Sequence, residues 1–575
     1  MPDTKQDALD MLRELTELTL LDEGDPQSFR VRAYENAAQA IGSEANDLGQ
    51  LSLSDLKKIR GIGQSTAQKI RELFETGTVQ KLEELRGRYP RSLVALLRLQ
   101  GVGPKAVRRL QAELGVQSLD DLTRAIGEQR LRKMKGFGEK SEQRLRDAIA
   151  RLEREGAFTR TSIAIALPHA ERLVAELAAV SGVTFAGYCG SLRRFSDTVG
   201  DVDIVVASMD PAKVMDAVVA LGAVDRVLAR GESKTSVVTR RGLQVDVRVV
   251  APHQLGAALL YFTGSKSHNV KLRQRALARG YTLNEYALSA LEGGAVIASE
   301  TEEEIYRALG LPGIAPELRE DWGGIEAAEE GRLPPALGPL SGDFHVHTNL
   351  SGDGRSSLEE MVATARARGY GVLALTDHAE GTLSGVGRDA LLDQRAKVRA
   401  LQSDVGASIR LLHGVELNIG PAGELDFDAD FRSGFDFCVA SIHSHFDMDR
   451  AAQTRRVVTA MQDPSVRMIG HLTARIIGRR PPVDLELSAV FEAACTTRTA
   501  LELNGALPRL DPPLDVLRAA QARGVTFLLT SDAHHTKELS LIDFAARYAH
   551  RAHLDTANVA NSWTAERLLS WLSAP

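Results

Sequence analysis

The sequence lacks the features that mark a secreted or membrane-bound protein. Its 575 residues include only three cysteines, Cys189, Cys438 and Cys495, which lie far apart and form no Cys-x-x-Cys pair. This spacing excludes a disulfide framework and a thiolate zinc site, so we expect the cysteines to be small core residues. The chain has no run of about 18 apolar residues and no N-terminal stretch with the layout of a signal peptide. The sequence therefore predicts a cytoplasmic protein without a membrane partner.

The chain as a whole also lacks a large excess of charge of one sign. Its net charge is −6, and its 43% hydrophobic and 25% charged residues are typical of a globular chain with several domains. The charge is unevenly distributed, because residues 57–150 contain 21 Lys and Arg against 11 Asp and Glu. Eleven of the fourteen histidines follow residue 341. This distribution predicts one part that binds phosphate and another that binds metal.

A pair of carboxylates marks the first candidate site. Asp201 and Asp203 stand one residue apart at the start of an apolar run, so in a strand they project from the same face. Two adjacent carboxylates repel each other, whereas two divalent cations stabilise the pair and assist an in-line displacement at phosphorus. Asp246 lies in a second β-rich run, 243–250, and offers a third ligand. The alternative is a solvated strand end beside an unrelated acidic residue.

The wider pattern resembles the nucleotidyltransferase palm of the polymerase beta superfamily. Gly190-Ser191 precedes Gly200-Asp-x-Asp203, as it does in that palm. The run Tyr261-Phe-Thr-Gly-Ser265 follows at the distance of the dNTP-binding subdomain in family X DNA polymerases. The resemblance implies template-directed addition of dNTPs to a primer, with Mg²⁺ or Mn²⁺ in the palm.

The resemblance also implies a role for each matching residue. Asp201 and Asp203 bridge both ions in this interpretation, and Asp246 binds the ion at the primer 3'-hydroxyl. The residues implied to bind the dNTP are Ser191, Arg194, Gly200, Tyr261, Phe262, Gly264, Asn269 and Arg273. For Tyr261 and Phe262 the alternative is core packing. Gln244 departs from the family, since the animal enzyme has an arginine at that position, near the primer terminus.

Three similar Gly-x-Gly segments lie in the basic region, at 59–64, 99–104 and 134–139. Paired glycines allow a tight hairpin and bring backbone N–H groups to phosphate at a helix N-terminus. The segments read as helix-hairpin-helix elements that bind DNA without regard to sequence. The residues that we expect to bind DNA are Gly61, Gly63, Gly101, Gly103, Lys105, Gly136 and Gly138. The alternative is that these segments are ordinary helix connections.

A candidate catalytic lysine follows the first of these segments. With Tyr34 and Arg30 upstream, Lys69 resembles the Schiff-base lysine of the family's lyase domain, which binds a 5'-phosphate. Phe29 and Ser65 stand where the animal enzyme has His and Lys, so fewer cations are available to lower the lysine pKa. The interpretations left open are a lyase nucleophile, a 5'-phosphate anchor and a lysine on a solvated helix face.

Histidines and carboxylates recur at the ends of β-rich runs after residue 341. His345 and His347 stand at strand spacing, and helical stretches such as 358–368 separate the runs. Strands that end in ligands and alternate with helices suggest a β/α barrel with its site at the C-terminal mouth. The members of the pattern are His345, His347, Asp353, His378, Glu416, His443, His471, Asp532 and His534.

This pattern resembles the polymerase and histidinol phosphatase domain, known as the PHP domain, over residues 341–575. The resemblance implies that the nine residues bind up to three ions, and a His and carboxylate set without thiolate suits Mn²⁺ or Zn²⁺. Such ions make water nucleophilic near neutral pH, which predicts hydrolysis of phosphoesters at DNA 3' ends. Leu472 replaces the proline that commonly follows the ligand at His471. His445 and Arg475 are further candidates for phosphate contact, and the alternative for either is a residue on the rim of the site.

The sequence thus predicts a multidomain α/β protein with N-terminal helix-hairpin-helix modules, an α+β nucleotidyltransferase palm and a C-terminal distorted β/α barrel. The expected divisions are a lyase-like helical domain at 1–80, a hairpin subdomain at 81–150, the palm at 151–255, the dNTP-binding subdomain at 256–315, a linker at 316–340 with one short helix, and the PHP domain at 341–575.

The predicted function is DNA repair. We expect a monomer that fills short gaps in nicked or gapped DNA bearing a 5'-phosphate, and whose PHP domain acts as a 3'-5' exonuclease or 3'-phosphoesterase. Two alternatives remain open at this point. Either the PHP domain is the only working catalyst and the palm delivers DNA to it, or the chain is a non-catalytic scaffold for DNA ends.

Overall fold

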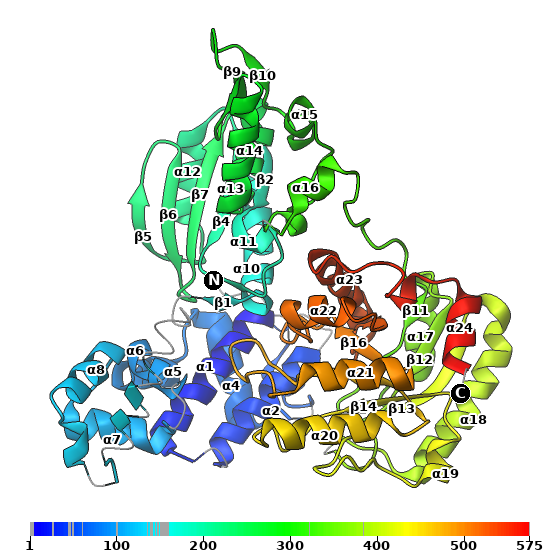
Figure 1. Cartoon of the computed structure of the whole chain (residues 1–575). Coiled ribbons are helices and arrows are strands. Elements are labelled where there is room, and N and C mark those ends of the chain that lie inside the picture. The colour runs from blue at the N-terminus through cyan, green and yellow to red at the C-terminus, as the bar shows by residue number, and fades with distance from the viewer. Residues whose placement is uncertain are drawn as a thin grey trace. The chain divides into compact units, whose positions relative to one another are not determined.

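The computed structural model describes residues 5–573 except 26–27, 44–47, 49–50, 60, 99–101, 135, 139–141, 144, 147–148, 150–159, 321 and 383. The chain divides into two compact units, Met1–Thr159 and Arg160–Pro575 (Figure 1).

The first unit is built from short amphipathic helices. Leucines at helical spacing on α1, among them Leu12, Leu15 and Leu18, are buried against α2 and α4. A second cluster forms around α7 and α8, where Val107, Leu110 and Leu122 are buried. The helices are α1 (Lys5–Glu23), α2 (Phe29–Ser43), α3 (Leu53–Leu56), α4 (Gln64–Thr76), α5 (Gln80–Arg88), α6 (Arg91–Val94), η2 (Ala95–Arg98), α7 (Pro104–Leu114), α8 (Leu119–Gly127) and η3 (Leu131–Lys133).

The second unit begins with a five-stranded mixed sheet in the order β2-β4-β7-β6-β5, in which β4 and β7 run parallel. Apolar residues of β4 and β7 pack against α10 and α12 on one face. Val205 and Val250 pack against α13 on the other face. The elements are β1 (Thr161–Ser162), α10 (Ile163–Ala178), β2 (Val183–Tyr188), α11 (Gly190–Arg193), β3 (Thr198–Val199), β4 (Val202–Ser208), α12 (Pro211–Ala220), β5 (Val224–Arg230), β6 (Lys234–Thr239) and β7 (Gln244–Val250).

A helical subdomain with a small antiparallel sheet follows the palm. Its elements are η4 (Pro252–Gln254), α13 (Leu255–Thr263), α14 (Lys266–Ala278), β8 (Tyr281–Leu283), β9 (Leu288–Ala290), β10 (Val296–Ala298), α15 (Glu302–Ala308), η5 (Pro316–Leu318) and α16 (Gly324–Glu329). Leu318, Ile325 and Ala328 pack into its core. The first half of the stretch expected as a linker is therefore part of this subdomain, because its apolar residues are spaced for burial on short helices.

A buried ion-pair network joins this subdomain to the palm. Glu302 accepts from Arg319 at 2.6 Å and from Arg193, which ends α11, at 2.6 Å. Although burial acts to raise the pKa of Glu302, the two guanidinium groups lower it to about 2.

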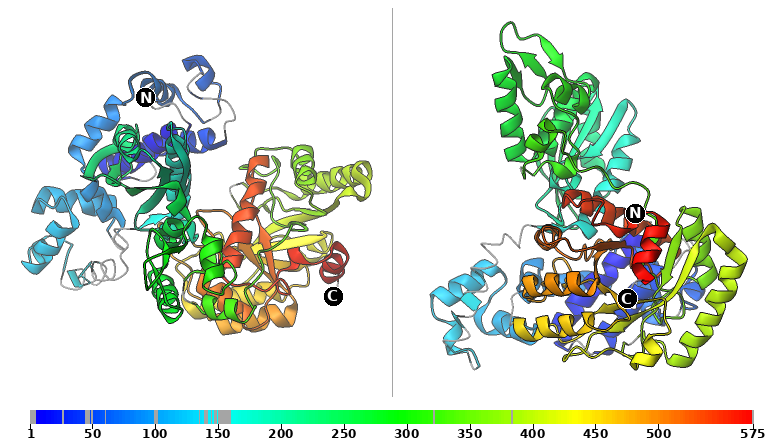
Figure 2. Two further views of the ribbon diagram at one scale, coloured as in Figure 1. Left: turned by 90° about the horizontal axis from the view of Figure 1, so that it is seen from above. Right: turned by 45° about the vertical axis from the view of Figure 1, so that its right-hand side comes forward.

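The C-terminal part is a nearly closed barrel of seven parallel strands in chain order, β11 to β17. A bridge between Val346 and Ala533 connects its two edges. Figures 1 and 2 show the helices of this part on the outside of the strands. The strands are β11 (Gly342–Asp343), β12 (Val372–Leu375), β13 (Arg410–Asn418), β14 (Phe437–Ser441), β15 (Val466–Gly470), β16 (Ala500–Asn504) and β17 (Phe527–Thr530). The helices are α17 (Leu358–Ala367), α18 (Arg388–Val405), η6 (Gly406–Ser408), α19 (Ala429–Arg432), α20 (Arg450–Met461), α21 (Leu487–Thr497), α22 (Leu514–Gln521), η7 (Thr536–Leu541), α23 (Ile542–Arg551), η8 (Ala560–Ser562) and α24 (Ala565–Ser573).

The predicted fold class is confirmed, including the distorted barrel. None of the helices in the described ranges has the length and apolar composition needed to span a membrane. The expectation for the cysteines is correct for Cys189 and Cys438, which are buried, and wrong for Cys495. That residue lies near the end of the amphipathic helix α21, on the side that faces solvent.

Candidate active sites

Strands β4 and β7 bring the palm carboxylates together. Asp203 on β4 pairs with Asp246 on β7 in parallel register, and Asp201 is exposed just before β4. Burial, reinforced by the charges of Asp201 and Asp246, raises the pKa of Asp203 to about 7. Divalent cations would relieve this repulsion, so the donor set fits metal ions.

Asp246 has side-chain contacts that the sequence analysis did not predict. Lys234 Nζ lies 2.7 Å from its Oδ2, and Gln244 Nε2 donates to its Oδ1 at 3.2 Å. Lys234 begins β6, the antiparallel neighbour of β7, so only knowledge of the pairing connects it to the site. Although burial acts to raise the pKa of Asp246, hydrogen bonds from Lys234, Ser236 and Gln244 lower it. A cation thus faces Asp246 even though Gln244 replaces the arginine of the animal enzyme.

The turn after β2 lies directly against these carboxylates. Gly190 begins α11 with φ of 60°, and a Cβ at this position would lie 2.5 Å from Asp203 Oδ2. A glycine is therefore required for the close approach. Ser191 is on the same short helix, and Arg194 follows its end. Arg194 Nε donates to Glu320 at 2.8 Å, and its Nη1 donates to the carbonyl oxygen of Thr263 at 2.5 Å.

The residues expected at the dNTP base and sugar lie around one small pocket. Tyr261, Asn269 and Arg273 line it, together with Leu283 and Asn284. Asn269 Nδ2 donates to the carbonyl oxygen of Tyr261 at 2.7 Å. Phe262 lies edge-on to Tyr261 with ring centroids 5.1 Å apart, and Gly264 has φ of 70°. Tyr261 is 37% exposed, which favours a surface role over core packing.

The first two Gly-x-Gly segments stand at helix N-termini. Gly63 is the N-cap of α4 and Gly103 is the N-cap of α7, and neither cap has a side-chain hydrogen bond. Gly61 has φ of 100°, and a Cβ there would lie 3.2 Å from the carbonyl oxygen of Asn36. The N–H groups of the first helical turns are thus available to an anion.

The other hairpin residues are described less completely. Gly136 has φ of 89°, and Gly138 follows it in the third segment. Gly101 lies outside the described residues. Lys105 is exposed in the first turn of α7, beside Gly103.

Charge reversal at Lys105 tests the contact between this hairpin and DNA. We expect Lys105→Glu to weaken binding equally for duplexes of different sequence, and to reduce the slope of log K against log salt by about one counterion or slightly more. Fluorescence anisotropy over a salt series measures both effects. Lys397→Glu is the matched control, since it makes the same charge change on an exposed part of α18. A slope equal to that of the control would mean that Lys105 does not contact phosphate.

Lys69 lies on α4 with its ammonium group near two partners. Its Nζ donates to Ser65 Oγ at 2.8 Å and lies 5.8 Å from the centroid of the Tyr34 ring. Burial is the main cause that lowers the pKa of Lys69, and Lys81 and Arg30 lower it further. The lowered pKa fits a nucleophile, whereas a phosphate anchor requires the ammonium charge, and the partial burial disfavours a fully solvated lysine.

The barrel places the nine predicted ligands at one mouth. They come from the C-terminal ends of six strands or the segments that follow them, where a β/α barrel gathers its functional side chains. Glu416 on β13 is the hub, with Oε1 3.4 Å from His345 Nε2, 3.3 Å from His443 Nε2 and 3.2 Å from His471 Nε2. Its Oε2 lies 2.7 Å from His378 Nδ1.

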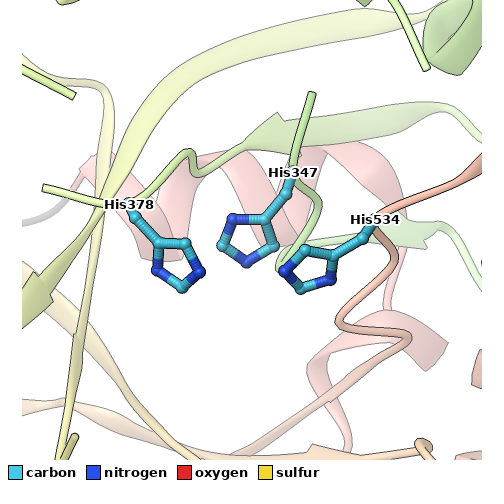
Figure 3. Close-up of side chains that lie close together, drawn as sticks. All are labelled: His347, His378 and His534. Carbon is cyan, nitrogen blue, oxygen red and sulfur yellow. The ribbon is translucent and has the colours of Figure 1, made fainter. Parts of the chain in front are cut away.

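The remaining ligands complete the same cluster. Asp532 Oδ1 lies 3.4 Å from His347 Nε2, and Asp353 Oδ2 lies 3.3 Å from His378 Nε2 and 3.6 Å from His534 Nε2. Figure 3 shows the imidazoles of His347, His378 and His534 side by side. Ring centroids are 4.3 Å apart for His347 and His378, and 4.2 Å apart for His347 and His534.

The chemistry of the cluster fits metal ions. Three groups in the described part of the chain have ligand atoms within 4.8 Å of one another, and all three belong to this mouth. His345 Nε2, His347 Nε2 and Glu416 Oε1 are buried and have no hydrogen-bond partner among the described residues. Burial, followed by the neighbouring His534 and His378, holds the pKa of His347 well below its usual value, so this imidazole stays neutral and able to ligate.

A set of hydrogen-bonding partners behind the ligands was not predicted. Glu502 on β16 accepts from His345 Nδ1 and from Thr530 Oγ1, both at 2.6 Å, and also from the backbone N–H of His471. Asn418 Oδ1 lies 2.7 Å from His443 Nδ1. Such partners fix the orientation of ligating imidazoles. One signal in the sequence could have identified Glu502. It is an acidic residue inside the apolar run Leu-Glu-Leu-Asn on β16, the one barrel strand that contributes none of the nine residues.

Arg475 does not lie where the sequence suggested. Its side chain is 6% exposed, donates to the carbonyl oxygens of Arg509 and Leu510, and pairs with Asp197 of the palm at 3.1 Å. The expectation of a phosphate contact is therefore wrong, because the guanidinium group is fully used inside the protein. His445 is exposed at the mouth, and its role as a phosphate contact stays a prediction.

Comparison with known proteins agrees with this geometry. Family models match residues 258–320 (DNA polymerase beta thumb), 343–505 (PHP domain), 3–79 (helix-hairpin-helix domain) and 93–151 (SAM-like helix-hairpin-helix tandem). A protein named DNA polymerase/3'-5' exonuclease PolX, from Bacillus subtilis (strain 168), is 34% identical over 562 residues, which are 97% of each chain. The chain belongs to the PolX family.

Two more distant relatives each match one part of the chain. DNA polymerase lambda from Rattus norvegicus is 26% identical over 327 residues, which are 51% of the chain and 53% of the relative. A probable phosphatase from Vibrio vulnificus (strain YJ016) is 26% identical over 227 residues, which are 38% of the chain and 87% of the relative. The resemblance inferred from the palm and barrel motifs is confirmed.

Proposed function

We propose that the protein is a DNA polymerase that fills short gaps with its palm and processes DNA 3' ends with its PHP barrel. The observation that carries the proposal is the presence of two separate donor sets in a member of the PolX family. The carboxylates lie on β4 and β7, and the nine histidines and carboxylates lie at the barrel mouth. The substrates are dNTPs and gapped or nicked DNA with a 5'-phosphate, bound by a monomer. A DNA substrate also implies that the protein works in the cytoplasm.

In the palm we assign Asp201, Asp203 and Asp246 to Mg²⁺ or Mn²⁺, and Ser191 and Arg194 to the triphosphate. When bound, divalent ions stabilise negative charge on phosphate oxygens and make water or a hydroxyl group a better nucleophile. Tyr261, with the neighbouring Phe262, orients the sugar of the dNTP. The remaining contacts to the nucleotide are assigned to Gly200, Gly264, Asn269 and Arg273.

In the barrel we assign the nine residues at the mouth to as many as three Mn²⁺ or Zn²⁺ ions. Imidazole and carboxylate donors without thiolate suit these ions. Glu502 and Asn418 hold His345 and His443 in the orientation for binding. In the first unit, the hairpin glycines and Lys105 hold the DNA backbone, and Lys69 anchors the 5'-phosphate.

The raised pKa of Asp203 predicts how the palm responds to pH. A protonated carboxyl group cannot bind a cation, and this group carries its proton below a pKa of about 7. We therefore expect the Mg²⁺ concentration for half-maximal primer extension to rise as the pH falls from 8 to 6. The rise should approach about tenfold per pH unit below 7, since one proton is displaced. The measurement is a Mg²⁺ titration of extension at several pH values, with DNA binding measured in EDTA as the control. A half-maximal concentration that is equal at pH 6 and pH 8 would contradict the assignment.

The proposed function is tested with a one-nucleotide gapped duplex that carries a label at the primer 5' end. With dNTPs and Mg²⁺ or Mn²⁺, the primer should lengthen by one nucleotide. Without dNTPs, Mn²⁺ should allow it to shorten. Shortening without extension would favour the barrel as the only catalyst, and neither activity would favour a DNA-end scaffold.

A further inference from the structure

Helix α23 of the barrel contacts the turn of the palm that carries Arg194. Arg551 Nη1 donates to the backbone carbonyl oxygen of Arg194 at 2.6 Å, and Arg547 Nη2 donates to that of Arg193 at 2.6 Å. Both arginines are on one face of α23, four residues apart, as helical geometry requires. Two successive carbonyl groups at the end of α11 are thus held by the barrel.

The aromatic residue that follows Arg194 is fixed by the same helix. Phe195 is fully buried and has φ of 60°, a conformation that a non-glycine residue adopts only when its surroundings impose it. Its ring stacks on Phe544 at a centroid distance of 5.8 Å and lies 6.4 Å from that of Tyr548, and the Arg547 guanidinium lies 4.6 Å from the ring centroid. These contacts fix the backbone on the C-terminal side of Arg194.

Arg551 and Arg194 also share one carboxylate. Glu320 Oε1 accepts from Arg194 Nε at 2.8 Å and from Arg551 Nη2 at 2.9 Å. Arg551 is 6% exposed, so its charge is poorly screened by solvent. Because Arg551 competes for Glu320, it weakens the hold of this carboxylate on the Arg194 guanidinium.

We propose that Arg551 is a positioning residue for the dNTP triphosphate: the PHP barrel uses it to hold the Arg194 turn and to divert Glu320 from the Arg194 guanidinium. The inference rests on the proposed role of Arg194 in binding the triphosphate. In this proposal the barrel contributes to the polymerase site as well as carrying its own activity. The barrel sets the affinity of the palm for its nucleotide.

The test measures KM for the dNTP and kcat in filling a one-nucleotide gap. Arg551→Met keeps the apolar stem and removes the hydrogen-bond donors. Of the two arginines that share Glu320, only Arg194 then remains to bind it. We expect KM to rise about tenfold, in proportion to the loss of charged hydrogen bonds, with kcat within about twofold of wild type. Adding Glu320→Gln to this variant removes the competing charge and should return KM towards the wild-type value. Arg366→Met, on an exposed part of α17, is the matched control.

The KM values of these variants decide whether Arg551 positions Arg194. An unchanged KM in Arg551→Met would overturn the proposal, and so would a rise that Glu320→Gln fails to reverse, since neither result fits diversion of Glu320 from the Arg194 guanidinium. If Arg551→Met does not fold, Glu320→Gln alone serves as the test, because it should lower KM a few-fold and an unchanged or higher KM overturns the proposal. Arg194→Lys separates this inference from the proposed function: an unchanged KM in that variant means that Arg194 does not bind the triphosphate at all.

Discussion

Asp203→Ala is expected to reduce nucleotide addition by at least about 10²-fold, because metal ions supply several kcal/mol of charge stabilisation in phosphoryl transfer. Burial, followed by the charges of Asp201 and Asp246, raises the pKa of this carboxyl group, and a divalent cation would relieve that cost. Without it the proposed metal site would lose one of its three carboxylates. Shortening of the 3' end should remain within about twofold of wild type, since its ligands all lie in the barrel.

The control for this variant is a carboxylate of the palm without a role in the site. Asp225→Ala removes an exposed side chain from β5 and should leave extension unchanged. Gap-filling rates with saturating dNTP and Mg²⁺ provide the comparison. Extension by Asp203→Ala within tenfold of wild type would mean that the palm does not use a two-metal site.

The second large effect is expected in the barrel. His347→Gln should reduce 3'-end hydrolysis by at least about 10²-fold, because loss of one imidazole lowers metal occupancy and disturbs the geometry of the remaining ligands. His347 is fully buried between His378 and His534, so no other side chain can take its place. Extension should survive, because α23 contacts the palm through residues 544–551 and not through the ligands.

The control here is a second buried histidine of the same barrel. His413 lies on β13, stacks on Phe435 with centroids 5.0 Å apart and belongs to none of the metal-ligand groups. His413→Gln should retain hydrolysis and bound metal. Metal content after dialysis, measured by mass spectrometry, gives a readout that does not depend on activity. Full metal content in inactive His347→Gln would assign His347 to substrate contact instead of metal binding.

The fold was largely predictable because its signals are local. Alternating apolar residues around Asp203 and Asp246 indicated strands, and leucines at helical spacing indicated the first unit. Ligands that end successive strands indicated the barrel, since a parallel barrel collects strand ends at one mouth. In the stretch 316–329 the expected short helix is present, but the prolines and acidic residues suggested a connection without a core of its own. Its few apolar residues are nevertheless buried in the core of the preceding subdomain.

The partners of the site residues were not predictable, because they depend on contacts between distant segments. Lys234 reaches Asp246 across neighbouring strands, and Glu502 reaches His345 from β16. The sequence suggested Arg475 as a phosphate contact because it does not reveal which groups surround the guanidinium. The burial that pairs it with Asp197 comes from packing of the barrel against the palm, which no local pattern in either segment records.

The central claim is that one chain carries two separate catalytic sites for DNA, each with its own ligands. The most direct measurement follows addition and shortening on the same labelled gapped duplex, with wild-type protein, Asp203→Ala and His347→Gln compared side by side in Mn²⁺. The account predicts a crossed result, in which Asp203→Ala shortens without extending and His347→Gln extends without shortening. Loss of both activities in either folded variant would contradict it.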